Sequence, residues 1–223
     1  MKKLNVLMLK SLVLSALLVG LITPLAAQTP KKLLIVTTTT GFRHSSIPTA
    51  EKVLAKLARE TGAFTVDFAQ QPTVKLNEPR KPKALATDAD DAAKQKYEAD
   101  QAKYQADFAK FKDAQKEFDA EMKKTLEKLS PENLKNYDGV VFANTTGDLP
   151  IPDREGFLNW LKSGKAFVGM HSCSDTFHGW PAFIKMLGGE FAGHGAQVGV
   201  ECLNQDPKHP STATLPAAWK INQ

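Results

Sequence analysis

Short apolar runs rich in β-branched residues alternate along this chain with segments of helical periodicity, and this alternation is the strongest constraint on its fold. Strands are predicted at residues 33–36, 64–68, 139–143, 166–170 and 197–203. Helices are predicted from Pro48 to Gly62, over residues 153–163, and around Phe183, Ile184 and Leu187. This order predicts parallel βαβ units, and hence a doubly wound α/β domain with a parallel sheet flanked by helices. Ligands of such domains bind beyond the carboxyl ends of the strands, so the loops at those ends are the candidate site.

Residues 85–129 depart from this rhythm, because they are rich in Ala, Lys, Asp and Glu and contain no Gly or Pro. A seam typical of coiled coils recurs there at spacings of four and three, formed by Tyr104, Phe108, Phe111, Gln115, Phe118, Met122 and Leu129. A single helix of this length would measure roughly 65 Å. We expect it to double back as a hairpin, lie across a partner or pack along the domain. The helical insertion, at about residues 75–129, could serve dimerisation or partner binding, or fold over its own domain.

The first 27 residues have the composition of a secretory signal. Lysines precede an apolar stretch at residues 12–22, and small residues ending at Ala27 resemble a cleavage site. We expect residues 1–27 to be removed and residues 28–223 to form one domain, located in the periplasm or outside the cell. The alternative is an uncleaved membrane anchor, although the uncharged stretch is short for a helix that spans a bilayer.

The charge balance argues against nucleic acid as a partner. The chain has 29 Lys and Arg residues and 24 Asp and Glu residues, but three of the lysines lie in the predicted signal. The remainder is close to neutral, so no basic field favours nucleic acid or an anionic surface. The two cysteines, Cys173 and Cys202, are too few for a disulfide framework, and we expect buried free thiols rather than a pair.

Polar clusters with candidate chemistry follow the predicted strands. They contain Arg43 and His44 after the first strand, Asn144, Thr145 and Asp148 after the third, His171, Ser172 and Asp175 after the fourth, and His194 after the last helix. His171 would stand at a sharp strand-to-helix turn, where Asp175 could orient a nearby imidazole. Each cluster also has a structural explanation, because the same residue types form turns and cap helices.

Three histidines, His44, His171 and His194, are expected at this edge of the sheet, where neutral imidazoles could act as acid–base groups or hold a divalent metal. No cofactor follows from a motif, because the chain lacks HExxH, CxxC, GxGxxG and GxxxxGK. The absence of GxSxG disfavours a Ser-His-Asp hydrolase. A thiol hydrolase that uses Cys173 as its nucleophile is a further alternative.

Several sequence motifs of this chain resemble those of a known family. They are GFRHSSIP at residues 41–48, YDGVVFANTTGD at 137–148 and FVGMHSCSDTF at 167–177, with shorter ones at 180–181, 187–194, 206–210 and 215–219. Together they resemble the ThuA-like (trehalose utilisation) family of the class I glutamine amidotransferase-like superfamily. The likeness covers residues 31–72 and 130–223. The helical insertion lies outside the family's common pattern, and the chain ends where family members usually continue.

The resemblance implies a flavodoxin-like fold and a carbohydrate ligand, either a disaccharide or an oxidised (keto) sugar. Glutaminase activity is not expected, because His171 stands where true amidotransferases carry a nucleophilic cysteine. In the resulting hypothesis His171 is the central acid–base or metal-binding group, assisted by His44, His194 and Asp175. The residues expected to position the substrate are Arg43, Asn144, Thr145, Asp148 and Ser172. The alternative is a non-catalytic sugar-binding or assembly module whose long helix recruits a partner or a second copy of the chain.

Overall fold

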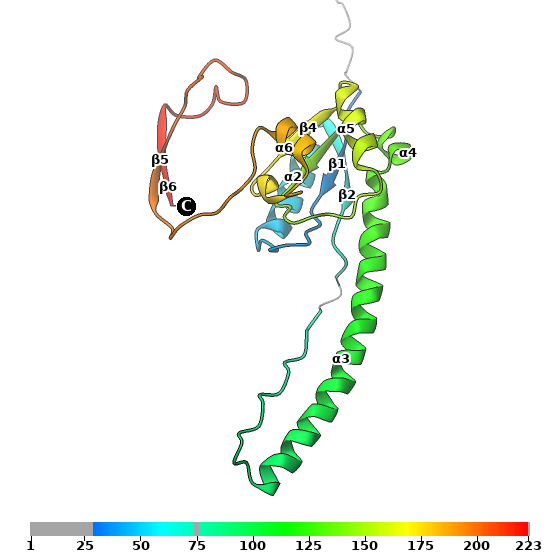
Figure 1. Cartoon of the computed structure of the whole chain (residues 1–223). Helices are drawn as coiled ribbons and strands as arrows, with labels where there is room; N and C mark the ends of the chain where they lie inside the picture. The colour runs from blue at the N-terminus through cyan, green and yellow to red at the C-terminus, as the bar shows by residue number, and fades with distance from the viewer. Residues whose placement is uncertain (1–28, 74–75, 223) are drawn as a thin grey trace, which may run out of the picture.

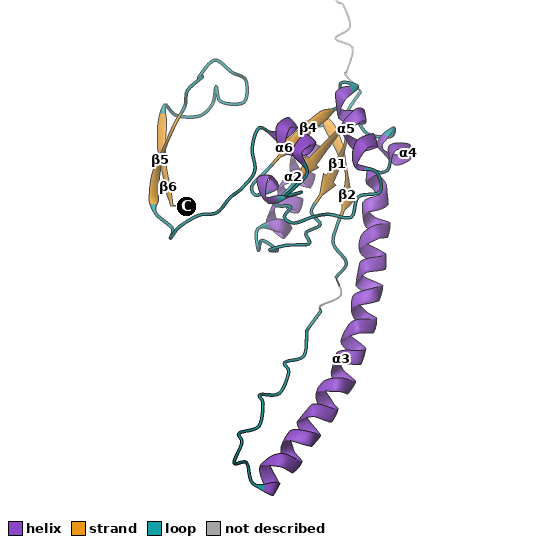
Figure 2. Ribbon diagram, viewed as in Figure 1, coloured by secondary structure: helices purple, strands orange, loops and turns teal. Residues whose placement is uncertain are grey.

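A parallel four-stranded sheet lies at the centre of the computed structural model, which describes residues 29–73 and 76–222 (Figures 1 and 2). Its strands are β1 (Lys31–Val36), β2 (Phe64–Ala69), β3 (Gly139–Phe142) and β4 (Ala166–Gly169), in the order β2-β1-β3-β4. All three neighbouring pairs are parallel. The predicted α/β class and the first four predicted strands are confirmed. The signal predicted at residues 1–27 lies outside the described residues.

The first residue of β3 is a glycine because the two neighbouring strands leave no room there for a side chain. Gly139 has Leu33 of β1 and Ala166 of β4 as its neighbours across the sheet. A Cβ atom at Gly139 would lie 2.9 Å from the Cβ atom of Ala166 and 3.0 Å from Cδ2 of Leu33. A larger side chain here would therefore push the central strands apart.

Helix α2 (Ile47–Thr61) covers one face of the sheet. Pro48 occupies its first turn, where the missing N–H costs no hydrogen bond, and Gly62 ends it in the left-handed conformation with a φ of 63°. Leu54 of this helix packs against a small core that contains Ile35 of β1 and Val141 of β3. The helix predicted from Pro48 to Gly62 is therefore confirmed, and its apolar stripe faces the sheet.

The opposite face of the sheet carries the larger core. It is covered by α4 (Pro131–Leu134), α5 (Arg154–Lys162), α6 (Pro181–Leu187) and the last turns of α3 (Asp91–Leu126). Phe142 of β3 is fully buried there, and its ring centroid lies 5.9 Å from that of Phe157 in α5 and 6.1 Å from that of Phe183 in α6. Because side chains alternate along a strand, Phe142 and its neighbour Val141 supply opposite cores.

Helix α3 is a single helix of 36 residues, about 54 Å long, that projects away from the sheet (Figure 1). The side chain of Asp90 caps its first turn. Met122 and Leu126 are the buried residues of the helix, and Leu129 of the following short helix η2 (Glu127–Leu129) is buried beside them. The segment is not a hairpin, and its predicted seam joins the core only near its carboxyl end.

Polar contacts fix this end of α3 to β2. Lys128 Nζ donates hydrogen bonds to Asp67 Oδ1 at 2.9 Å and to the carbonyl oxygen of Phe68 at 2.6 Å. The Tyr137 hydroxyl donates to Asp67 Oδ2 at 2.6 Å. Although partial burial favours the neutral carboxyl, the hydrogen bonds from Tyr137 and Lys128 lower the pKa of Asp67 below its usual value. The junction between the helix and the sheet is therefore built on an ionised carboxylate.

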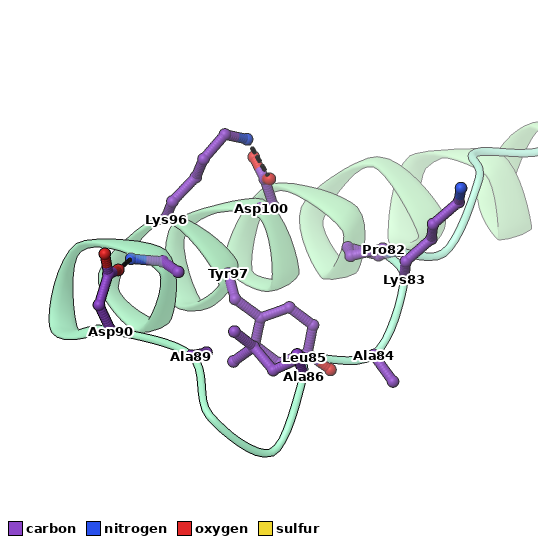
Figure 3. A pocket seen from close by; sticks show the side chains of 11 residues that line it. Pro82, Lys83, Ala84, Leu85, Ala86, Ala89, Asp90, Lys96, Tyr97 and Asp100 are labelled. Atoms are coloured by element: carbon purple, nitrogen blue, oxygen red, sulfur yellow. Dashed lines mark hydrogen bonds and ion pairs between the residues drawn. The ribbon is translucent and has the colours of Figure 1, made fainter.

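The far end of α3 has few contacts. Residues 76–90 lead from β2 to the amino end of the helix and meet it there (Figure 1). Leu85 and Tyr97 line a shared hollow at this tip, and Lys96 forms an exposed ion pair with Asp100 at 2.7 Å (Figure 3). Exposed ion pairs contribute little to stability, so the tip is held loosely. Within residues 29–73 and 76–222, no helix has both the length and the apolar composition that crossing a membrane requires.

The predicted fifth strand does not join the parallel sheet, which corrects the expectation from the sequence. β5 (Gly199–Leu203) pairs antiparallel with β6 (Ala218–Asn222), a strand that was not predicted, and the two form a separate hairpin (Figure 2). Residues 204–217 connect the two strands, and each strand satisfies the backbone hydrogen-bonding groups of the other without the parallel sheet. β4 is thus an edge strand of the four-stranded sheet, and Val168 in it is 49% exposed.

The two parts of α3 should respond differently to mutation. Leu126→Ala should lower the free energy of unfolding by about 2–5 kcal/mol, because it leaves a cavity among fully buried side chains. Lys116→Ala, at an exposed position on the same helix, should change the free energy of unfolding by less than about 0.5 kcal/mol.

Replacing residues 80–110 with a short Gly-Ser linker should leave the free energy of unfolding of the sheet unchanged. Urea unfolding followed by circular dichroism measures all three, and equal stability of Leu126→Ala and Lys116→Ala would contradict the assignment of this turn to the core.

Candidate functional site

The carboxyl edge of the sheet gathers three of the predicted clusters. His44 follows β1, Asn144 follows β3, and His171 and Ser172 follow β4. Strand order β2-β1-β3-β4 places the chain reversal between β1 and β3, and open α/β sheets bind ligands at this type of switch point. The loop after β1 is tied to the loop after β3 by the hydrogen bond from Thr40 N to the carbonyl oxygen of Thr146, at 3.1 Å.

His44 and Ser172 form the central contact of this edge. Nε2 of His44 lies 2.9 Å from Oγ of Ser172, which also lies 3.4 Å from the carbonyl oxygen of Thr145. Either the hydroxyl donates to a neutral ring nitrogen or the ring N–H donates to the hydroxyl. Partial burial lowers the pKa of His44, the neighbouring His171 lowers it further, and Asp175 opposes them weakly. His44 is therefore a neutral imidazole at pH 7, and its partner in the chain is a hydroxyl.

His171 stands beside this pair with its side chain exposed to solvent. Its ring centroid lies 4.9 Å from that of His44, in an edge-on arrangement. The backbone of His171 is fixed by Asn144, whose side-chain Nδ2 donates a hydrogen bond to the His171 carbonyl oxygen. The structure thus confirms that His44 and His171 come together, and it leaves the imidazole of His171 free to meet a ligand.

Asn144 holds an unusual backbone conformation at the end of β3. Its φ is 60°, a left-handed value that asparagine adopts more readily than most residues. The residue is 6% exposed, and its Oδ1 atom is buried with no hydrogen-bond partner among the described residues. Buried polar atoms are normally paired, so this oxygen is an unsatisfied acceptor that lies beneath the surface of the site.

Thr145 lies beneath the site rather than at its surface. Its hydroxyl is fully buried and lies 2.8 Å from that of Thr176. The neighbouring backbone is closed by hydrogen bonds from Gly147 N to the Asp175 carbonyl oxygen, at 2.8 Å, and from Phe177 N to the Gly147 carbonyl oxygen, at 3.1 Å. The predicted contact of the Thr145 side chain with substrate does not fit this burial, and Thr145 instead holds the loops after β3 and β4 together.

Two other predicted substrate residues make contacts with side chains or backbone outside the His44–Ser172 pair. Arg43 donates to Gln71 Oε1 at 2.7 Å and to the carbonyl oxygen of Thr37 at 3.2 Å. Asp148 forms an ion pair with Arg154, whose guanidinium lies 5.2 Å from the ring centroid of Phe177. Both side chains keep exposed surface, but neither is hydrogen-bonded to the pair of His44 and Ser172.

Asp175 orients an imidazole, as predicted, but that imidazole belongs to His178. His178 Nε2 lies 2.7 Å from Asp175 Oδ1, and Nδ1 lies 3.2 Å from Glu190 Oε2. The hydrogen bond with Asp175 is the main cause of a raised pKa of His178, with a smaller contribution from Glu190. The sequence singled out Asp175 and not its partner three residues later. No helical spacing signals this contact, because the short helix Cys173–Asp175 ends before His178 and Phe177 has a φ of 61°.

His194 does not join the other predicted ligands. It is exposed, its Nδ1 lies 2.8 Å from the carbonyl oxygen of Gly195, and its ring packs near Phe191 with centroids 5.8 Å apart. Over residues 29–73 and 76–222, no three His, Cys, Asp or Glu side chains are arranged to hold a metal ion. The predicted metal set of His44, His171 and His194 is therefore not assembled in this structure.

The environment of Cys173 does not suit a nucleophile. The side chain is buried, and burial raises the pKa of its thiol to about 12, although a hydrogen bond with Thr145 opposes the shift. Nucleophilic cysteines need a thiolate and access to substrate. Both cysteines are free, with Cys173 buried as predicted and Cys202 only partly so.

The carboxylates around His178 should make stability depend on pH. Because the pKa of folded His178 lies above its unfolded value of about 6.5, its contribution is complete below that pH and is lost as the pH rises through the folded pKa. Wild type should exceed His178→Gln in stability by less than about 1 kcal/mol near pH 6, since the pair is exposed, and the difference should vanish near pH 9. Urea unfolding across this range measures the difference.

His209→Gln is the matched control for His178→Gln, because His209 contacts the Ser211 hydroxyl and no carboxylate. Its stability difference from wild type should not change with pH over the same range. A difference between wild type and His178→Gln that grows with pH would contradict the assigned ion pairs.

One solved structure similar to this chain is that of a ThuA-like protein from Bacteroides uniformis ATCC 8492. The two share 20% sequence identity with a TM-score of 0.51, over 87% of this chain and 59% of the other. At this identity the likeness supports the α/β fold, and this chain spans 59% of the length of that protein. A comparison with curated proteins gave no match.

A protein family also matches this chain, over a defined range of residues. The ThuA family, described as trehalose utilisation, matches residues 90–223, more than half of the chain. The matched residues include α3 and the loops after β3 and β4, and they begin after the loop that carries His44. The description of the ThuA family links it to carbohydrate metabolism in general. The chain therefore belongs to the ThuA family of the class I glutamine amidotransferase-like superfamily.

Proposed function

We propose that this protein acts on a carbohydrate, either a disaccharide or an oxidised keto-sugar, at the carboxyl edge of its sheet. His44 and Ser172 form the proton-transfer pair, and His171 contacts the ligand. The observation that carries the proposal is the 2.9 Å contact between His44 Nε2 and Ser172 Oγ at the switch point between β1 and β3. Export through residues 1–27 is part of the proposal, and N-terminal sequencing of the processed protein tests it.

The contact between His44 and Ser172 has the geometry that proton transfer requires. Its length lies within the range in which a general base reaches a proton, about 2.6–3.2 Å. The lowered pKa of His44 keeps the ring neutral near pH 7, so its nitrogen can accept a proton from the hydroxyl. A hydroxyl activated in this way can exchange a proton with a sugar hydroxyl or with the hydrate of a keto group.

The remaining groups at this edge suit a neutral, polyhydroxylated ligand. The exposed ring of His171 can donate a hydrogen bond to a sugar hydroxyl or accept one from it. Among residues 29–73 and 76–222, no Arg or Lys is hydrogen-bonded to the His44–Ser172 pair. Sites for phosphate or carboxylate ligands commonly use such charged donors. The family's description supports a sugar in particular.

Substitutions at the pair should remove activity without unfolding the protein. His44→Gln and Ser172→Ala should each lower turnover of the sugar at least about a hundredfold, the typical contribution of a positioned acid–base group. His171→Gln should weaken ligand binding. His209→Gln, in an exposed loop, is the control and should behave as wild type. Nuclear magnetic resonance of trehalose and a keto-disaccharide measures turnover, calorimetry measures binding, and thermal unfolding checks the fold.

The pH dependence of the wild-type turnover rate gives a second test of the role of His44. Because neutral His44 is the active form, the rate should rise with pH through a pKa below 6.5 and be level above pH 7. Retention of turnover by both His44→Gln and Ser172→Ala would overturn the proposal.

A second candidate function is partner recruitment by α3. Tyr104, Phe108 and Phe111 lie close together on the projecting part of the helix, with the Phe108 ring centroid 5.6 Å from that of Tyr104 and 6.0 Å from that of Phe111. An aromatic row on a helix that leaves its own domain is suited to pairing with a second copy of the chain. In light scattering, the full chain should then be a dimer and the variant with residues 80–110 replaced should be a monomer. The same number of subunits in both proteins would exclude this candidate.

A further inference from the structure

A cavity of about 490 Å³ lies between the loop after β1 and the carboxyl-terminal part of α3. This volume is within the range of small-molecule sites. One wall comes from the carboxyl edge of the sheet and the other from the helix, with Thr39, Gln71, Gln115, Phe118, Asp119 and Pro150 among the lining residues. The cavity therefore exists only because the last turns of α3 pack beside the sheet edge.

The sheet side of the cavity is organised around Gln71. Its Oε1 atom accepts hydrogen bonds from Thr39 N at 3.2 Å, from Thr39 Oγ1 at 3.1 Å and from Arg43 at 2.7 Å. These three donors fix the plane of the amide. Its Nε2 group makes no hydrogen bond within the residues that the structure describes, so two donors are left for a ligand.

The helix side supplies acceptors and an apolar ring. Gln115 Nε2 donates to Asp119 Oδ1 at 2.9 Å, which leaves Gln115 Oε1 and Asp119 Oδ2 as acceptors. Phe118 lies between them in the sequence and is partly buried against the core. A sugar ring has hydroxyl groups around its edge and C–H bonds on its faces. Donors, acceptors and one aromatic ring around a cavity of this size match that chemistry.

The cavity and the proposed site share the loop after β1. Thr40 and Gly41 line it, and His44 follows three residues later, so the Cα atoms of Gly41 and His44 lie no more than about 11 Å apart. Thr40 is also held to the loop after β3 through Thr146. A ligand of two linked rings could therefore place one ring in the cavity and the other against His44.

We propose that this cavity is a subsite for the non-reacting ring of a disaccharide, with α3 as the element that selects disaccharides over monosaccharides. The inference rests on the proposed function for the class of ligand. It assigns to α3 a role in specificity that is separate from any role of its projecting part in assembly.

Calorimetry with trehalose and with glucose tests the subsite on the full chain. Gln115→Ala should raise the Kd for trehalose about twofold to tenfold, the effect of one lost hydrogen bond, and leave the Kd for glucose unchanged. Phe118→Leu, which keeps apolar packing, should act in the same direction. Gln105→Ala, at an exposed position of the same helix outside the cavity, is the matched control and should bind both sugars as wild type does. Thermal unfolding confirms that each variant is folded.

The outcomes separate this inference from the proposed function. If Gln115→Ala and Phe118→Leu bind trehalose as Gln105→Ala does while His44→Gln loses turnover, the subsite is wrong and the proposed function stands. An equal loss of affinity for trehalose and glucose in Gln115→Ala also overturns the subsite, because a single ring would then occupy the cavity. If wild type binds neither sugar nor a keto-disaccharide, both proposals are wrong.

Discussion

The parallel pairing of β1 with β3 is the constraint on which the rest of this structure depends. Val36 pairs with Phe142 at the ends of the two strands, so the loops that follow leave the sheet at the same edge. Both strands bury side chains on both faces, and a shift of one residue would send every side chain to the wrong core. The register is therefore fixed by hydrophobic burial, and the meeting of His44 with the end of β4 is a consequence of it.

Helix α3 combines two physically different parts. Its last turns carry Met122 and Leu126 into the core and are joined by Lys128, whose ammonium group meets Asp67 of β2. Within the described residues, Tyr104, Phe108 and Phe111 of the earlier turns do not join that core, and most positions around them are exposed. The family match begins at residue 90 and therefore includes both parts of the helix. The end that packs against the sheet is part of the domain.

Two histidines near the same sheet edge show how local surroundings set chemistry. His44 loses hydration and faces a second imidazole, so its pKa falls and the ring is neutral. His178 lies between Asp175 and Glu190, and its pKa rises for that reason. One ring is thus suited to accept a proton near neutral pH, while the other is suited to hold two acidic loops together.

The sequence by itself determined the class of fold and the loops that could hold a site. Apolar runs separated by amphipathic helices specify parallel βαβ units, because each pattern buries its apolar side in only one way. The same reasoning placed His44, Asn144 and His171 at the carboxyl edge, and the structure brings all three there.

Only the tertiary structure decided which of these residues touch. Ser172 lies 128 positions from His44, and no local pattern encodes a contact at that separation. The same holds for the antiparallel pairing of β5 with β6 and for the division of α3 into a packed and a projecting part. His194, although equally well placed in the sequence, stays away from the site. Periodicity reports which side of an element is apolar, whereas the partner it meets is set by the packing of the whole chain.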